Sequence, residues 1–134
     1  MYVGIVPYKL RKTKKLGQLP VEQLLWPLNK PSNAFRVKDL GENDHIVIFP
    51  YSKTVLTASA QVTCKVSLII VEPRAVHARY YNIIPILRHL YHNILIRDPK
   101  IASKYNNVHS FSFADLWIET ENLKLPDLSQ KRGI

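Results

Sequence analysis

A chain of 134 residues with 46% hydrophobic and 22% charged residues is long enough for one domain and apolar enough to fill one core. No apolar run approaches the roughly 20 residues that a membrane-spanning helix needs. The basic residues near the amino terminus follow the apolar ones, which is not the order of a secretory signal. The single cysteine, Cys64, excludes an internal disulfide and lacks neighbours for a zinc site, so we expect a buried thiol in a reducing, cytoplasmic compartment.

The net charge of +9 is concentrated at the front of the chain. Residues 1–40 carry eight Lys or Arg against two Asp or Glu, and residues 9–15 alone hold five of the basic side chains. A basic loop of this kind attracts the phosphates of nucleic acid, anionic lipid head groups or phosphorylated ligands. The same run is also typical of a solvated loop that binds nothing.

In the first half of the chain, residues 2–6 form a short β-rich run that Pro7 closes, and the basic loop follows it. Pro20 and the apolar residues of VEQLLWPL predict at most a short helix, because Pro27 interrupts the pattern. Residues 45–50, HIVIFP, form a continuous apolar run of the type buried in parallel sheets. We expect a turn with an irregular element over residues 51–63.

The second half carries the stronger patterns. Residues 65–71 predict a third strand, and residues 79–92 show a helical stripe in which Pro85 either kinks the helix or lies in its first turn. Residues 94–96 predict a fourth strand, Asp98 and Pro99 begin a short helix over 99–105, and residues 108–113 predict a half-buried strand.

This alternation of strands and helices predicts an α/β fold, a single Rossmann-like three-layer domain with a mostly parallel sheet. The domain is expected to cover residues 1–118. Residues 119–134 show no strong period and are expected to form a linker or tail.

Glu72 follows the apolar run 65–71, and the carboxyl end of a strand is where open α/β sheets bind ligands. A carboxylate at the rim of an apolar strand is a candidate general base near neutral pH. Arg74, His77 and Arg79 follow closely in the chain. An ion pair of Glu72 with Arg74 or Arg79, or a helix N-cap, would explain the same carboxylate without any function.

Other familiar motifs do not occur in this sequence. The five histidines show no HxxxH pair of the zinc-protease type, and no GxGxxG, GxxxxGK[ST] or GxSxG motif occurs. We therefore expect no metal and no cofactor.

Several features of residues 65–118 occur together in one known family. These are the Glu72-Pro73 step at a strand end, an aromatic pair at 80–81 in the next helix, Asp98 after the next strand, and Trp117-Ile118 at the close. The run resembles the amino-terminal lobe of bacterial and viral glycosyltransferases related to the family-10 fucosyltransferases. The ending KRGI also resembles the start of the strand that leads into their second lobe. Arg97, and residues 113–116 in place of an aromatic-glycine step, depart from the family pattern.

The resemblance implies the acceptor-side lobe of a two-lobe (GT-B) enzyme of polysaccharide biosynthesis, which transfers a sugar from a nucleotide-sugar donor to a glycan. Glu72 would take the proton of the acceptor hydroxyl, and Arg74, His77 and Arg79 would line the acceptor side. The donor lobe would lie after Ile134, so we expect a truncated chain that is inactive or weakly active alone. Turnover would need a donor-binding lobe in another chain, or a second copy bound through the uncovered face.

Two other interpretations stay open. Residues 9–15 with Tyr8 and Tyr51 would suit a small basic nucleic-acid-binding module, although no helix-turn-helix, RNP-like or base-stacking pattern supports it. A small α/β scaffold would instead bind a protein partner through an apolar surface. We favour the glycosyltransferase interpretation.

Overall fold

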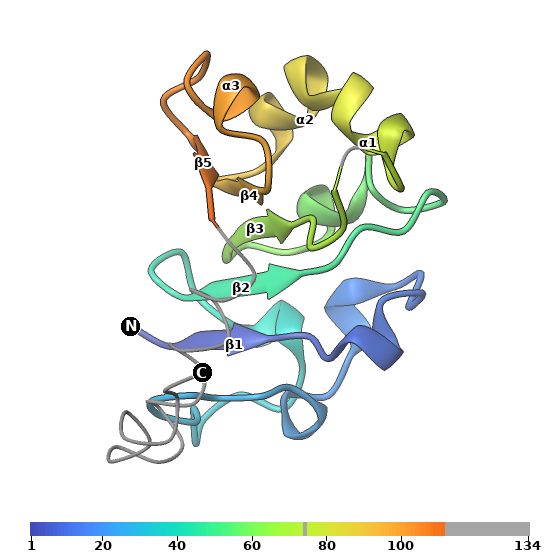
Figure 1. The fold of residues 1–134 in the computed structure, drawn as a ribbon. Helices are drawn as coiled ribbons and strands as arrows, with labels where there is room; N and C mark the ends of the chain where they lie inside the picture. Colours follow the sequence, from blue (N-terminus) through green and yellow to red (C-terminus); the bar gives the residue numbers. More distant parts are fainter. Residues whose placement is uncertain (74, 112–134) are drawn as a thin grey trace, which may run out of the picture.

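In the described part of the computed structural model, five parallel strands form one sheet, and their order in space follows their order along the chain (Figure 1). The structure describes residues 1–73 and 75–111. The strands are β1 (Val3–Ile5), β2 (His45–Ile48), β3 (Lys65–Ile69), β4 (Ile94–Ile96) and β5 (Val108–Ser110). Each strand pairs in parallel with the next, as where Gly4, Ile46 and Val66 lie side by side. The predicted α/β class with a parallel sheet is confirmed.

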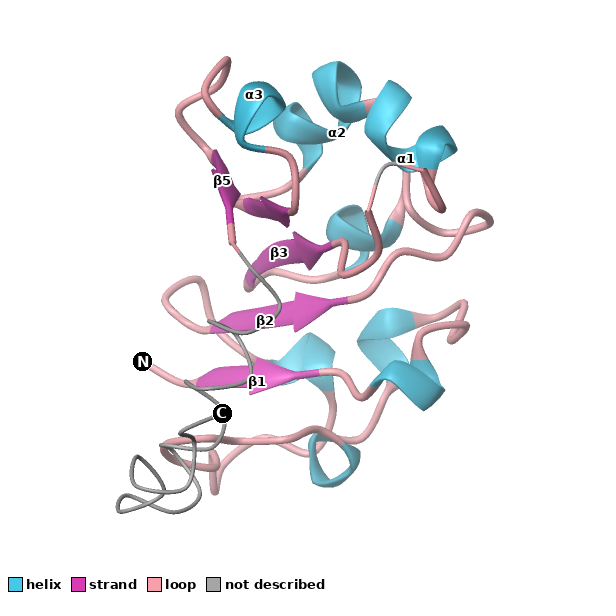
Figure 2. Cartoon of the chain, in the orientation of Figure 1, coloured by secondary structure: helices cyan, strands magenta, loops and turns pink. Residues whose placement is uncertain are grey.

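The connections between the strands contain only short helices (Figure 2). They are η1 (Tyr8–Leu10), η2 (Leu16–Gln18), η3 (Val21–Gln23), η4 (Val37–Asp39), η5 (Ala58–Gln61), α1 (Ala78–Asn82), α2 (Ile84–Leu90) and α3 (Pro99–Ala102). The helix expected over 79–92 breaks at Ile83, and Pro85 lies in the first turn of α2, where it loses no helical hydrogen bond. Asp98 caps α3 as predicted, because its carboxylate accepts from the N–H groups of Lys100 and Ile101.

The two faces of the sheet are buried to different degrees. Ile46, Leu68 and Ile94, which lie on one face, are fully buried in a core shared with the helical connections. Figures 1 and 2 show several of the helical turns behind the strands. On the opposite face Ile5 and Val47 are only half-buried. Ser67 and Ile69 of β3 on this opposite face are buried, so among the described residues the two faces differ in burial mainly at β1 and β2.

The outer edge of β1 is covered by the segment that follows η3. Ile5 and Leu25 exchange two backbone hydrogen bonds of 2.8 Å in an antiparallel bridge. This pairing explains why the short helix expected after Pro20 ends at Gln23: the chain becomes extended where β1 offers it free backbone groups.

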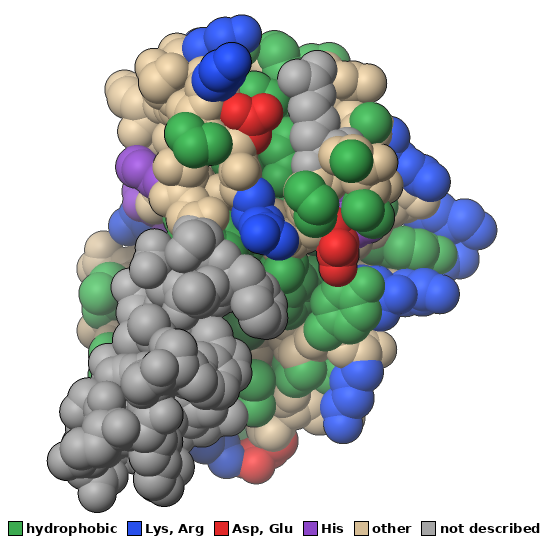
Figure 3. Space-filling model, in the orientation of Figure 1, with side chains coloured by type: hydrophobic (Ala, Val, Ile, Leu, Met, Phe, Trp, Pro, Cys, Tyr) green, Lys and Arg blue, Asp and Glu red, His purple; other side chains and the backbone are tan. Residues whose placement is uncertain are grey.

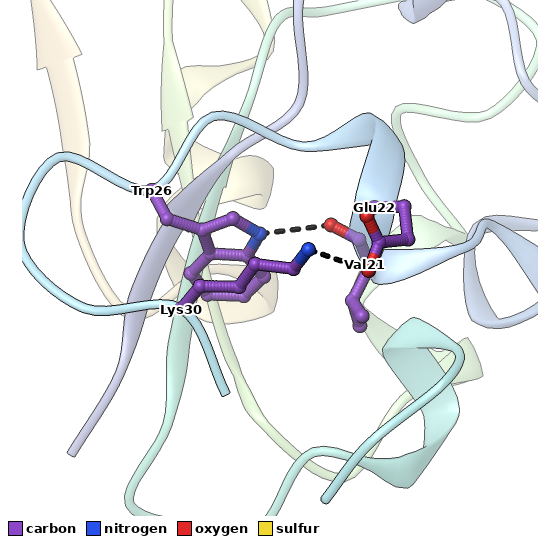
Figure 4. Close-up of polar contacts among 4 residues, drawn as sticks. All are labelled: Val21, Glu22, Trp26 and Lys30. Carbon is purple, nitrogen blue, oxygen red and sulfur yellow. Dashed lines mark hydrogen bonds and ion pairs between the residues drawn. The ribbon is translucent and has the colours of Figure 1, made fainter. Parts of the chain in front are cut away.

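Trp26 fixes the same segment against β1. Its indole Nε1 donates to the carbonyl oxygen of Val21 at 2.8 Å, and an ion pair between Lys30 and Glu22 lies beside it (Figure 4). Gly4 allows the approach, since a Cβ at this position would lie 2.7 Å from Cζ3 of Trp26.

Two further predictions from the sequence concern membrane-spanning helices and the end of the chain. No helix in the described ranges has the length and apolar character needed to cross a membrane. The predicted tail over 119–134, and the Trp117-Ile118 pair, lie outside the described residues.

Candidate functional site

The carboxyl ends of β1, β2 and β3 open into a pocket of about 430 Å³. Its first wall follows β1 and its second follows β2, while the third combines the end of β3 with the start of α1. Since the strands are parallel and paired in order, the loops after them meet at one edge of the sheet. The lining residues are Tyr8, Arg11, Lys12, Phe49, Pro50, Tyr51, Ser52, Val71, Glu72, His77, Arg79 and Tyr80.

The structure brings three of the four predicted site residues into this pocket. Glu72, His77 and Arg79 all line it, and Arg74 lies outside the described residues. The sequence pattern predicts a ligand site at the carboxyl end of a strand but does not indicate which other strands contribute to it. In this sheet the order of the described strands does not reverse, so the pocket forms over three consecutive strands and not at a reversal point.

The backbone of Glu72 is fixed while its carboxylate is exposed. Its carbonyl oxygen accepts a 2.9 Å hydrogen bond from the hydroxyl of Tyr81, and that hydroxyl accepts one of 3.2 Å from the N–H of Arg97. Burial raises the pKa of Tyr81, which keeps the phenol protonated as a donor at neutral pH. Tyr81 therefore ties the end of β3 to the end of β4.

Two of the alternative explanations of the Glu72 carboxylate, an ion pair with Arg79 and a helix N-cap, are not observed among the described residues, and Arg74 lies outside them. The described part of the chain contains one ion pair, Lys30–Glu22, so Arg79 does not neutralise Glu72. No described helix uses Glu72 as its N-cap. Glu72 is also the one carboxylate among the described residues that line the pocket.

His77 packs into the wall of the pocket. Its ring meets Tyr80 edge to face, with 5.1 Å between the ring centroids. Its Nδ1 atom is shut off from solvent and has no hydrogen-bond partner among the described residues. His77 thus shapes the pocket beside Tyr80, and the exposed acid–base group on this wall is Glu72.

The wall that follows β1 holds a positioned arginine. The guanidinium carbon of Arg11 lies 3.9 Å from the centroid of the Tyr8 ring, and one of its nitrogens donates to the carbonyl oxygen of Tyr8 at 3.1 Å. Tyr8 in turn meets Phe49 edge to face at 5.2 Å. On the opposite wall the guanidinium of Arg79 lies 5.7 Å from the centroid of Tyr80. Cations and aromatic rings therefore alternate around the pocket.

Basic side chains are also prominent on this part of the surface. Figure 3 shows Lys and Arg side chains concentrated along the right-hand side, where the strands of Figure 1 point, with an acidic side chain next to them. Within the described ranges, no three His, Cys, Asp or Glu side chains gather as a metal site.

The aromatic wall after β2 and the position of the basic loop beside Glu72 are not evident from the sequence. Tyr8, Tyr51 and the basic loop suit the nucleic-acid interpretation, and the pattern of residues 45–50 predicts Phe49 inside a strand, whereas the structure brings Tyr8, Phe49 and Tyr51 into the pocket of Glu72. Their position along the chain could have revealed this site. Tyr8 and the basic loop follow the first strand, and Phe49 and Tyr51 follow the second, just as Glu72 follows the third.

Comparisons of this chain with protein families, curated proteins and solved structures found no match. Function is therefore inferred from the pocket and its residues.

Proposed function

We propose that the pocket binds the acceptor glycan of a sugar-transfer reaction and that Glu72 is the general base. The observation that supports this proposal is an exposed carboxylate, not neutralised by any described cation, in a pocket walled by aromatic rings. A volume of about 430 Å³ falls within the roughly 300–1,000 Å³ of small-molecule sites. The proposal agrees with the resemblance of residues 65–118 to the acceptor-side lobe of glycosyltransferases.

In the proposed reaction, an acceptor hydroxyl attacks the anomeric carbon of the donor sugar while its proton passes to the Glu72 carboxylate. The bond between the anomeric carbon and the nucleoside diphosphate breaks, and the diphosphate leaves with the bonding electron pair. Tyr81 acts as a positioning residue, because its hydroxyl fixes the backbone of Glu72 relative to β4. Tyr51, an aromatic ring that lines the pocket, offers an apolar face against which a sugar ring packs.

The pocket supplies only the acceptor side of this reaction. The diphosphate of a donor needs its own cationic surface in line with the acceptor, which the proposal assigns to a second lobe or chain. Glycan binding, and not turnover, is therefore the activity to measure on this chain.

The test is a calorimetric titration of the protein with defined oligosaccharides. We expect Glu72→Gln to weaken the binding of a recognised glycan by about tenfold or more, since a hydrogen bond from a sugar hydroxyl to a carboxylate is worth about 1.5–3 kcal/mol. Glu42→Gln removes an exposed carboxylate outside the pocket and should leave the affinity unchanged. Equal affinities of the wild type and Glu72→Gln, with intact circular dichroism spectra, would exclude the proposed role of Glu72.

Nucleic-acid binding is the second candidate, because Arg11, Lys12 and two tyrosines of the pocket could hold phosphates and stacked bases. The same variant separates the two functions. Glu72→Gln removes a negative charge, so it should strengthen or maintain the binding of a single-stranded oligonucleotide, and that binding should fall steeply with salt.

A further inference from the structure

We infer that the acceptor glycan of this pocket is acidic, with a carboxylate or sulfate group on one of its sugars held by Arg11 and Lys12, while Arg79 on the opposite wall adds to the positive potential of the pocket. The inference rests on the proposed function and names the class of its substrate.

The charge balance of the pocket is the first observation. Among the described residues, three cations and one carboxylate line it, and none of these cations pairs with a described carboxylate. The cations come from two separate segments, the turn after η1 and the start of α1. A neutral oligosaccharide needs no such excess of positive charge, whereas an anionic group within the pocket would compensate part of it.

The geometry of Arg11 is the second observation. One face of its guanidinium lies on the Tyr8 ring, and one nitrogen is bound to the Tyr8 carbonyl oxygen, so the group is held in place before any ligand arrives. The remaining N–H groups form the planar fork that matches the two oxygens of a carboxylate or sulfate. Because little rotamer freedom is left to lose, this site binds an anion at a reduced entropic cost.

The distribution of charge also orients the ligand. Arg11 and Lys12 belong to the β1 side of the pocket and Glu72 to the β3 side, with the residues that follow β2 between them. Two strand spacings separate these sides, about 10 Å. An acidic sugar bound with its anion near Arg11 keeps that charge away from Glu72 and leaves a neutral hydroxyl to approach the carboxylate.

The test compares ligands that differ only in charge. The full chain is titrated with an oligosaccharide that contains a uronate, with the same oligosaccharide after reduction of its carboxylates to alcohols, and with a sulfated oligosaccharide of equal length. We expect at least one acidic ligand to bind about tenfold or more tightly than the reduced one, a difference that corresponds to about 1.4 kcal/mol.

Two variants locate the effect. Arg11→Gln should bring the acidic and reduced ligands to within about twofold of each other, while Lys104→Gln, which removes an equal charge outside this pocket, should keep the preference. Lys12→Gln serves the same purpose if Arg11→Gln lacks the native circular dichroism spectrum. A preference carried only by the sulfated ligand supports the inference and identifies the anion.

The titrations distinguish a failure of this inference from a failure of the proposed function. Equal binding of acidic and reduced glycans would overturn this inference and leave the proposed function standing. A preference lost equally in Lys104→Gln would overturn it as well, since net charge would then be the cause. Absence of binding to all glycans would remove the proposed function together with the inference.

Discussion

Gly4 lies at a point of β1 where the Trp26 indole leaves no space for a side chain. A Cβ would meet Cζ3 and Cη2 of Trp26 at 2.7 and 2.8 Å, and the indole cannot move freely because its N–H is bound to the Val21 carbonyl. We expect Gly4→Ala to lower the free energy of unfolding by about 1–3 kcal/mol, the usual cost of overpacking. Thermal and guanidinium denaturation would measure it.

Gly41 provides a matched control for this substitution. A Cβ there would lie 3.7 Å from the Asp44 carboxylate, an ordinary contact, and its backbone does not have a positive φ. Gly41→Ala should leave the free energy of unfolding unchanged or raise it by up to about 1 kcal/mol, because alanine reduces the conformational entropy of the unfolded chain. If both alanine variants behaved alike, the close approach of Trp26 would not be the cause.

We expect His45 to make the stability of the fold depend on pH. Burial lowers its pKa below the usual value, and His92 and Lys65 lower it further. The imidazole Nε2 also lies 2.6 Å from the Ser67 hydroxyl oxygen. As the pH falls, the His45 imidazole is protonated in the unfolded chain before it is protonated in the folded protein. The stability that the neutral, buried His45 contributes is therefore complete above about pH 6.5, and it is lost as the pH falls through the lowered pKa of the folded state.

We therefore expect His45→Gln to lose less stability than the wild type between pH 7.5 and pH 5, as measured by urea denaturation at both values. His89→Gln replaces a histidine that is exposed on α2, and it should show the same acid loss as the wild type. An acid loss in His45→Gln as large as that of the wild type would contradict the assignment.

At the scale of the elements, α3 depends on its N-cap because it is only four residues long. The Asp98 carboxylate accepts from Lys100 N at 2.9 Å and from Ile101 N at 3.3 Å. Asp98→Ala should cost about 1 kcal/mol of folding free energy, whereas Asp98→Asn, which keeps a capping oxygen, should cost much less. Equal losses in the two variants would point to the charge of Asp98 and not to the cap.

The elements that the sequence predicted best are those fixed by local chemistry. The apolar strands, the break in the helix before Pro85 and the Asp98-Pro99 start of α3 all follow from neighbouring residues. The segment after Pro20 shows the limit, because its extended part is set by hydrogen bonds with Ile5, some twenty residues earlier. A local pattern cannot report such a partner.

At the scale of the whole molecule, the candidate site illustrates the same limit. Glu72 could be chosen from the sequence because it ends a strong strand. That Tyr8, Arg11 and Phe49 share its pocket follows only from the pairing of three strands at one edge. The set of side chains in the pocket is therefore determined by which strands are neighbours in the sheet, although each of these residues simply follows the carboxyl end of a strand.

The strand order has a consequence for how the chain is made. Each strand hydrogen-bonds to the one before it, and Val3 finds its partner His45 only 42 residues later. During translation, β1 waits until β2 has been made, but each later described strand emerges when the strand it pairs with has already been synthesised. The order of the sheet allows the nascent chain to grow its native pairing one strand at a time.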